Sequence, residues 1–213
     1  NFPETIELLP ASKAVLTGSP IRQELLSGDR QHALDFTGLT DGKPVILIIG
    51  GSLGAVAVNE AVRRILPVLL KDFQVIHLCG KGKLDPSLNA LDGYVQYEYI
   101  KDELKDLFAL SDIVISRAGA NAICELLALR KPNLLILLSA NASRGDQILN
   151  ARSFERQGFS AVMEEEEITN EKLLDTIHEL FQNRDRYISA MKSSNQQDSI
   201  DTIIDLIESV ARA

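Results

Sequence analysis

The sequence predicts an α/β fold in which six parallel strands form one doubly wound, Rossmann-like sheet with helices on both faces. Short, continuous apolar runs recur along the chain, small residues follow several of them, and stretches of helical character separate them. Continuous apolar runs are typical of parallel strands buried on both faces, and their alternation with helices is typical of βαβ units. The predicted strands are residues 45–49, 73–79, 94–97, 112–116, 134–138 and 160–163.

Helices are predicted between these strands and after the last of them. Four predicted helices end near Lys71, Leu110, Leu129 and Gln157, and three more cover residues 168–182, 184–193 and 198–211. Ahead of the sheet, we predict a short apolar strand at residues 13–17. A brief helix at residues 21–26 follows Pro20, because proline is favoured in the first turn of a helix. Residues 27–43 then form a connector with one helical turn.

The composition is that of a globular protein and excludes several classes of function. The chain has 213 residues and a formal net charge of −8, so the basic surface that nucleic-acid binding requires is not expected. Its longest apolar runs, residues 45–49 and 134–138, are far shorter than the ~20 residues that cross a bilayer. Its two cysteines, Cys79 and Cys124, form no CxxC motif. This argues against a disulfide framework or a zinc site and favours a reducing cytoplasm.

The segment after the first sheet strand, residues 50–55, has the sequence GGSLGA and leads into a helix. Its glycines let the backbone turn sharply and approach a ligand closely, and the free N–H groups at the start of the helix suit a phosphate. Ser52 adds a hydroxyl group. The spacing matches neither GxGxxG nor the P-loop. An ordinary tight turn between strand and helix is therefore the alternative to phosphate binding.

A second small-residue turn, SRAGA at residues 116–120, follows the fourth sheet strand. The helix after it is almost wholly apolar, and Glu125 is its only acidic residue. A carboxylate on a buried helix is unfavourable unless it is paired or hydrogen-bonded. Two interpretations remain open: a structural pair with Arg117 or Arg130, or a carboxylate that accepts two hydroxyl groups of a sugar, such as a ribose diol.

A polar loop at residues 139–147 follows the fifth sheet strand, and Asp146 and Gln147 open the next helix. Both side chains can bind hydroxyl groups, but an acid is also favoured at a helix N-terminus without any ligand, and this structural interpretation is preferred on these residues alone. The acidic run at residues 164–167 is interpreted as a solvated surface, and the GKGK sequence at 80–83 as a loop. No histidine is placed as a general base, and no Ser/His/Asp signature is present.

Together, these motifs resemble the carboxyl-terminal half of the MurG family. The matching segments are GGSLGA at 50–55, SRAGA at 116–120 with Glu125, and GDQ at 145–147 followed by Asn150 and Ala151. Residues 17–22, TGSPIR, resemble the segment in which that family's chain leaves its first domain. The resemblance extends from about residue 11 to the end of the chain.

MurG proteins are inverting glycosyltransferases of the GT-B fold that act without a catalytic metal. They transfer N-acetylglucosamine from UDP-N-acetylglucosamine to lipid I, which gives lipid II for peptidoglycan synthesis. The resemblance therefore implies that this chain is the second, donor-binding domain of a GT-B enzyme. It also implies that no cofactor is needed, and that lipid I and the catalytic base belong to the amino-terminal domain.

The resemblance assigns no catalytic residue to this chain, but it assigns a set of donor-binding residues: Arg22, Gly51, Ser52, Leu53, Gly54, Ile100, Ala120, Asn121, Ala122, Ile123, Cys124, Glu125, Asp146 and Gln147. The glycine-rich segment would face the diphosphate, and Arg22 would lie at the interdomain cleft. The backbone of Ile100 would bind the uracil edge, and Ala120–Glu125 would line the nucleoside, with Glu125 accepting the ribose hydroxyls. Asp146 and Gln147 would hold hydroxyls of N-acetylglucosamine. Some relatives have Gln-Gln at this pair, so the role of Asp146 has less support than that of Gln147.

The resemblance also divides the chain. Residues 1–22 are expected to be the tail of an amino-terminal domain and the interdomain linker, residues 23–195 the UDP-sugar-binding domain, and residues 196–213 a helix that packs back on the amino-terminal domain. Membrane contact is expected mainly through that other domain. We therefore expect this chain to be soluble, cytoplasmic and inactive alone, and the parent enzyme to be peripheral on the cytoplasmic face of the membrane.

Several alternatives share the predicted fold. One is the UDP-sugar-binding half of another GT-B enzyme, such as a glycolipid glycosyltransferase or one subunit of a split N-acetylglucosaminyltransferase. A GT-B-like UDP-N-acetylglucosamine epimerase is another. The third is a nucleotide-sugar-binding module without catalytic activity.

Overall fold

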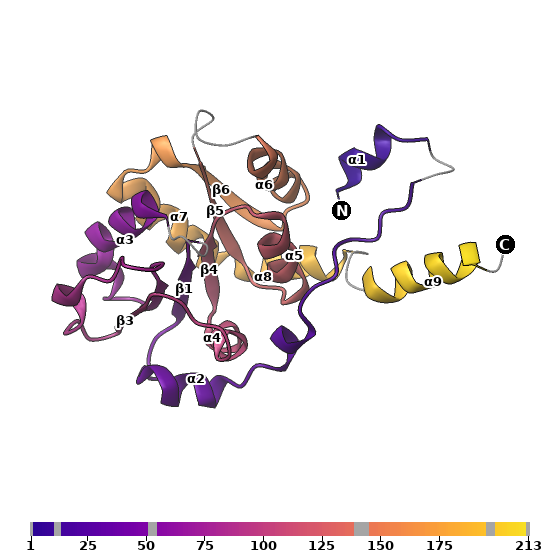
Figure 1. Cartoon of the computed structure of the whole chain (residues 1–213). Helices are drawn as coiled ribbons and strands as arrows, with labels where there is room; N and C mark the ends of the chain where they lie inside the picture. Colours follow the sequence, from indigo (N-terminus) through magenta and orange to yellow (C-terminus); the bar gives the residue numbers. More distant parts are fainter. Residues whose placement is uncertain (1, 11–13, 51–54, 139–144, 195–198, 212–213) are drawn as a thin grey trace.

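The computed structural model describes residues 2–10, 14–50, 55–138, 145–194 and 199–211. Six parallel strands form one sheet in the order β3-β2-β1-β4-β5-β6, as predicted (Figure 1). Their bounds are β1 Val45–Ile49, β2 Gln74–Leu78, β3 Tyr94–Tyr97, β4 Ile113–Ser116, β5 Asn133–Leu137 and β6 Ser160–Glu164. The chain moves outward from β1 to β3, returns to β4 beside β1, and moves outward again to β6. The carboxyl ends of β1 and β4 therefore meet at the switch point, where such sheets bind ligands.

The centre of the sheet is buried on both faces. Ile48 of β1 lies between His77 of β2 and Ile115 of β4, and all three residues are fully buried. This explains why β1 is a continuous apolar run rather than an alternating one. The buried core fixes the register of the strands, and with it the positions of the loops at their carboxyl ends.

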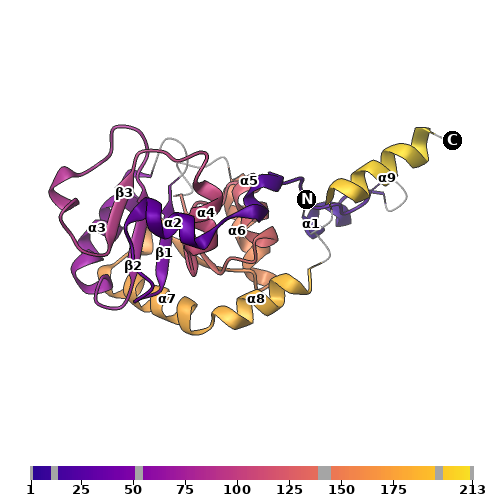
Figure 2. The same cartoon turned by 90° about the horizontal axis from the view of Figure 1, so that it is seen from below.

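Helices cover both faces of the sheet, with α2, α4 and α6 on one side of the strands in Figure 2 and α7 on the other. The helices within and after the sheet are α3 Val56–Leu69, α4 Leu104–Leu110, α5 Ala120–Ala128, α6 Asp146–Arg156, α7 Asn170–Gln182 and α8 Arg184–Lys192. All were predicted, with bounds that differ by a few residues. Gly50, Arg117 and Leu138 directly follow β1, β4 and β5, so these residues lie at the carboxyl edge of the sheet, ahead of α3, α5 and α6.

The amino-terminal part of the chain differs from the prediction. Residues 14–17 are not in a strand, and Val15 is 55% exposed. The apolar run fails to become a strand because it lies outside the sheet and has no neighbouring strand to pair with. The brief helix after Pro20 is a 3₁₀ helix, η2 Gln23–Ser27. A short helix that was not predicted, α1 Pro3–Glu7, lies further upstream.

The connector also contains more helix than predicted, because α2 spans Arg30–Thr37. The carboxylate of Asp29 caps its start by accepting hydrogen bonds from the backbone N–H groups of Gln31 and His32. Gly38 ends the helix with a φ of +71°, a conformation that glycine adopts without strain. An aspartate before a helix and a glycine after it are recognisable in the sequence, so this helix was predictable.

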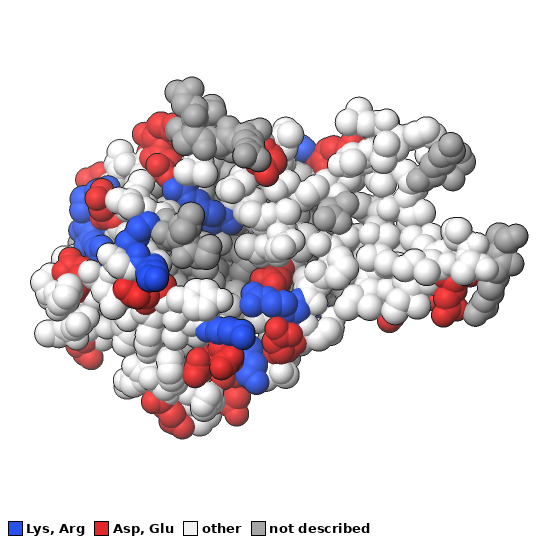
Figure 3. All heavy atoms as spheres, viewed as in Figure 1, with Lys and Arg blue, Asp and Glu red and all other residues white. Residues whose placement is uncertain are grey.

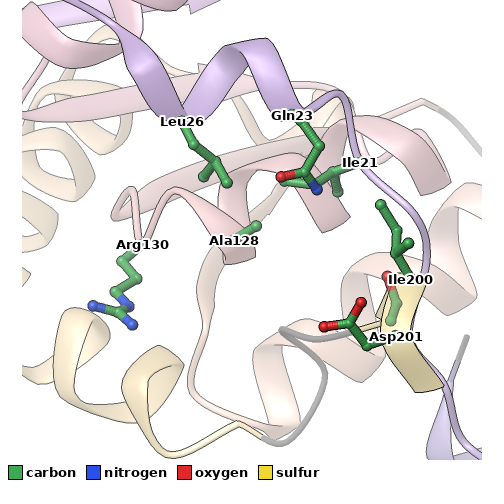
Figure 4. A pocket seen from close by; sticks show the side chains of 8 residues that line it. Ile21, Gln23, Leu26, Ala128, Arg130, Ile200 and Asp201 are labelled. Atoms are coloured by element: carbon green, nitrogen blue, oxygen red, sulfur yellow. The ribbon is translucent and has the colours of Figure 1, made fainter.

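The last helix, α9 Ser199–Ala211, projects from the same end of the molecule as α1 in both views (Figures 1 and 2). Its apolar side chains Ile204 and Val210 are 47% and 76% exposed. Its first turn approaches the rest of the chain, where Ile200 and Asp201 line a cavity together with η2 and the end of α5 (Figure 4). Within the described residues, no helix is both long and apolar enough to span a bilayer.

Candidate functional site

A hollow lies at the carboxyl edge of the sheet, where the sequence analysis places the ligand. Its described lining comes from the residues after β1, β4, β5 and β6 and from the first turns of α3: Gly50, Ala55, Val56, Ala57, Glu60, Arg117, Leu138 and Glu165. Acidic and basic side chains are interspersed on the face shown in Figure 3. The hollow therefore combines one cationic side chain, two carboxylates and a helix N-terminus.

Helix α3 begins at this hollow. Its N-cap, Ala55, has no side chain that can cap the helix, so no side chain satisfies the first backbone N–H groups from the N-cap position. The 14 residues of α3 carry a dipole whose positive end lies at this point. The predicted diphosphate-binding residues Gly51, Ser52, Leu53 and Gly54 lie outside the described residues, and their role remains a prediction. The start of α3 directly after them is suited to an anion.

Glu125 and Arg22 form a bidentate ion pair. Nε and an Nη of Arg22 donate to the two carboxylate oxygens of Glu125 over 2.8 and 3.0 Å. The Glu125 side chain is 12% exposed, and that of Arg22 45%. The structural alternative, an ion pair with an arginine, is therefore present, but the predicted partners Arg117 and Arg130 are wrong because Arg22 engages both carboxylate oxygens. The structure thus brings together two residues that the resemblance assigns to the donor site.

The remaining predicted residues of α5 differ in orientation. Ile123 and Cys124 are buried in the core, whereas Asn121 is exposed and Ala120 and Ala122 are half-buried. A ligand at the start of α5 can therefore meet Ile123 and Cys124 only through their backbone. Burial also raises the pKa of the Cys124 thiol, so this thiol is protonated at neutral pH.

Ile100 lies in the loop after β3, and its side chain belongs to the core. Its predicted contact with uracil must therefore come from the backbone, as the sequence analysis proposed. The neighbouring Tyr99 is 63% exposed. The structure does not bring Ile100 into the hollow lined by α3 and Arg117.

Asp146 and Gln147 occupy the first turn of α6, after Gly145, whose φ is +88°. Asp146 is exposed, in agreement with a favourable charge at a helix N-terminus. Gln147 differs, because its amide oxygen Oε1 is buried and accepts no hydrogen bond from the residues that the structure describes. Buried polar atoms are nearly always hydrogen-bonded in folded proteins, so this oxygen marks a place where a ligand or a water molecule fits.

Sequence analysis missed Glu165 as a residue of the hollow. Residues 164–167 were interpreted as a solvated acidic surface, and this is correct for Glu164, Glu166 and Glu167, which are exposed. Glu165 differs, because it is half-buried and forms an ion pair with Arg117. Arg117 also donates to the backbone oxygen of Ile136 over 3.1 Å. The position of Glu165 directly after a sheet strand was the signal that could have identified it.

Each of the three histidines has a partner outside the hollow. His77 is fully buried between Tyr94 Oη and Asn59 Oδ1, each 3.0 Å from a ring nitrogen. Burial lowers its pKa to about 3, so it is neutral at physiological pH. His32 pairs with Asp106 over 2.7 Å, and His178 lies 3.8 Å from Asp72.

Both cysteines are free thiols. In the described part of the chain, no three His, Cys, Asp or Glu side chains gather as the ligands of a metal ion would.

Comparison with known proteins agrees with this architecture. Residues 45–207 match the model of the glycosyltransferase family 28 C-terminal domain. The UDP-N-acetylglucosamine–N-acetylmuramyl-(pentapeptide) pyrophosphoryl-undecaprenol N-acetylglucosamine transferase of Lachnoclostridium phytofermentans is 67% identical over 210 residues. That match covers 99% of this chain but only 59% of the relative.

Two solved structures show the same fold at lower identity. MurG of Acinetobacter baumannii has a TM-score of 0.69 at 24% identity, covering 98% of this chain and 58% of its own. A glycotransferase of kitacinnamycin has a TM-score of 0.73 at 18% identity, covering 94% and 50%. These neighbours confirm the predicted fold, a Rossmann-like half of a two-domain glycosyltransferase architecture.

Proposed function

The chain belongs to the family of glycosyltransferase family 28 C-terminal domains, and from this premise we propose that it binds the nucleotide-sugar donor of an N-acetylglucosaminyltransferase. The donor is UDP-N-acetylglucosamine, and the acceptor is a lipid-linked N-acetylmuramyl pentapeptide, lipid I. The relative that is 67% identical carries this activity in its name. The product serves peptidoglycan synthesis.

The observation that carries the proposal is the carboxylate of Glu125 on α5. This helix follows β4, which lies beside β1 at the switch point of the sheet, and Glu125 is the only acid on that helix. Ionised carboxylates accept hydrogen bonds from a vicinal diol at both oxygens. Arg22 already engages both oxygens, which shows that two donors can reach them together.

Two further features support a nucleotide sugar rather than a nucleoside alone. The positive end of the α3 dipole is directed at the hollow and suits a diphosphate. The amide oxygen of Gln147 is buried and accepts no hydrogen bond from the described part of the chain, so it can accept one from a sugar hydroxyl. Helix α6 is joined to the turn before α5 because Asn150 donates to the backbone oxygen of Ala118 over 3.3 Å. The sites for ribose and sugar therefore have a fixed separation.

The chemistry of transfer explains why the donor site includes a helix N-terminus. Cleavage of the sugar–phosphate bond leaves negative charge on UDP, and fixed N–H dipoles stabilise that charge more in the transition state than in the bound donor. The acceptor hydroxyl must lose a proton during the attack. The resemblance to the MurG family implies that the base belongs to the amino-terminal domain, so we place it in the part of the relatives that this chain does not cover.

This division has consequences for the ends of the chain. We propose that residues 1–22 and α9 belong to the junction with an amino-terminal domain, and that α9 packs on that domain. The exposed Ile204 and Val210 support this, because such side chains are normally covered. Membrane contact of the parent enzyme, on the cytoplasmic face, is assigned mainly to that other domain.

Calorimetric titration of the chain with UDP-N-acetylglucosamine, UDP-glucose and UDP tests the proposal. We expect binding of all three, with UDP-N-acetylglucosamine the tightest. Equal affinity for UDP-glucose would favour a glycolipid glycosyltransferase instead, and absence of UDP binding at millimolar concentration would contradict donor binding altogether. We also expect no turnover of lipid I by the chain alone; turnover would show that the chain contains the base.

A further inference from the structure

The pair formed by Arg117 and Glu165 connects three strand ends. Arg117 directly follows β4, and one Nη of its guanidinium donates to the backbone oxygen of Ile136 in β5. The other Nη donates to Glu165, which follows β6. The two side chains are 12% and 25% exposed. A single guanidinium is thereby held over the end of β5 by contacts from both neighbouring strands.

This guanidinium lies in the hollow at the start of α3. Ala55, Val56 and Ala57 contribute the first turn of α3 to the lining, and Arg117 contributes the only cationic side chain among its described residues. A guanidinium has five N–H donors in one plane, and the two contacts above use one on each Nη. Donors therefore remain for a ligand opposite the helix N-terminus.

We propose that the guanidinium of Arg117 binds the diphosphate of the nucleotide sugar, and that Glu165 is the positioning residue that holds it in place. The proposal rests on the proposed function, since it takes a nucleoside diphosphate as the ligand of the hollow. Arginine matches phosphate oxygens with two parallel N–H donors, and these contacts are about twice as strong as neutral hydrogen bonds. The phosphates would lie between the helix N-terminus and this cation.

Glu165 has a positioning role because the arginine side chain is long and flexible. A free arginine side chain loses rotamer entropy when it is fixed, and a preorganised one has already lost it before the ligand binds. Glu165 and the Ile136 carbonyl fix both ends of the guanidinium. A glutamine at position 165 retains an oxygen that can accept the same hydrogen bond, whereas an alanine does not.

The test compares UDP with uridine, which lacks the phosphates, by calorimetric titration of the 213-residue chain. We expect Arg117→Gln to weaken UDP binding about tenfold or more, because charged hydrogen bonds are lost. We expect Glu165→Ala to weaken it several-fold and Glu165→Gln to restore most of the affinity. Uridine affinity is expected to stay within about twofold in all three variants. The matched control is Glu166→Ala, which removes an equal charge from the exposed neighbour in the same acidic run.

The possible outcomes separate the interpretations. Equal losses of UDP and uridine affinity would show that the pair only stabilises the fold, and would overturn the proposal. Tighter UDP binding by both Glu165 variants would show that Glu165 repels the diphosphate and does not position Arg117. Unchanged UDP binding in Arg117→Gln would overturn the proposal but leave the proposed function intact. If the wild-type chain binds neither uridine nor UDP, both fail.

Discussion

Replacing Glu125 with alanine tests the donor site directly. The substitution removes a carboxylate that is 12% exposed and that accepts two hydrogen bonds from Arg22. In the proposed complex, the ribose diol takes the place of Arg22 on the same two oxygens, because a carboxylate offers its two-oxygen edge to one bidentate partner at a time. Glu125→Ala should therefore weaken UDP binding and leave the fold intact.

The magnitude follows from two opposing contributions. Loss of charged hydrogen bonds to the ribose costs about 1.5–3 kcal/mol. Against this, ribose binding to the wild type must first break the Arg22–Glu125 pair, which contributes about 1 kcal/mol because the Arg22 side chain is partly exposed. The net loss is about 0.5–2 kcal/mol, which corresponds to an affinity that is about 2- to 30-fold lower.

The assay is a double-mutant cycle between protein and ligand. UDP and its 2′,3′-dideoxy analogue are titrated into the wild-type chain and into Glu125→Ala. If Glu125 binds the diol, removal of the hydroxyls weakens binding to the wild type but has no further effect on the variant. Asp41→Ala is the matched control, because Asp41 pairs with Arg30 over 2.8 Å in the connector.

The result that would refute the assignment is a UDP affinity of Glu125→Ala within twofold of the wild type while circular dichroism shows an intact fold. Equal losses for UDP and the dideoxy analogue would also refute it. That pattern would mean that Glu125 acts only by holding Arg22.

Three further predictions concern stability and are measured by urea or thermal unfolding. The hydrogen bond to Asp106 raises the pKa of His32, so this contact contributes fully below the unfolded-state pKa of about 6.5 and is lost as the pH rises through the folded-state value. The stability advantage of the wild type over His32→Ala should therefore shrink between pH 6 and 9. Burial lowers the pKa of His77 to about 3. The contribution of neutral His77 to the free energy of unfolding is therefore fully present above about pH 6.5 and falls by about 2 kcal/mol at pH 5. His77→Gln should lack this acid-dependent loss of stability. A chain that ends at Ser194 should keep the melting temperature within a few degrees and expose less apolar surface, whereas a large drop would show that α9 packs on the sheet domain.

The sheet was predictable because burial on both faces leaves a local signal. The sequence of β1, VILII, is apolar at every position, and the structure buries Val45 to Ile48 completely. The same signal failed at residues 13–17, where an equally short apolar run lies outside the sheet. Whether an apolar run becomes a strand depends on a neighbouring strand that can pair with it, and the run itself carries no information about that neighbour.

A hollow at the carboxyl edge of the sheet was predictable, but the pairing of the charged side chains around it was not. Topology places every residue that follows a parallel strand at one edge of the sheet, which identified the segments around Arg117 and Gln147. The partner of Glu125 is 103 residues away, and Arg117 and Glu165 are 48 residues apart. Contacts at such separations depend on how the linker and the strand ends pack, and local sequence patterns carry no information about this packing. The sequence analysis therefore predicted the wrong arginine partner for Glu125 and predicted a solvated side chain for Glu165.

The position of Arg22 links nucleotide binding to the segment that precedes η2. Because Arg22 and the ribose use the same edge of Glu125, each weakens the binding of the other by the same factor. Arg22→Ala removes this competitor, and uridine, which has no phosphates to attract a cation, should bind up to about fivefold tighter, the equivalent of about 1 kcal/mol. For UDP the gain should be smaller, because a released Arg22 near the donor also attracts the diphosphate. A titration in which uridine affinity does not change would show that the ribose reaches Glu125 from another side and leaves the ion pair in place.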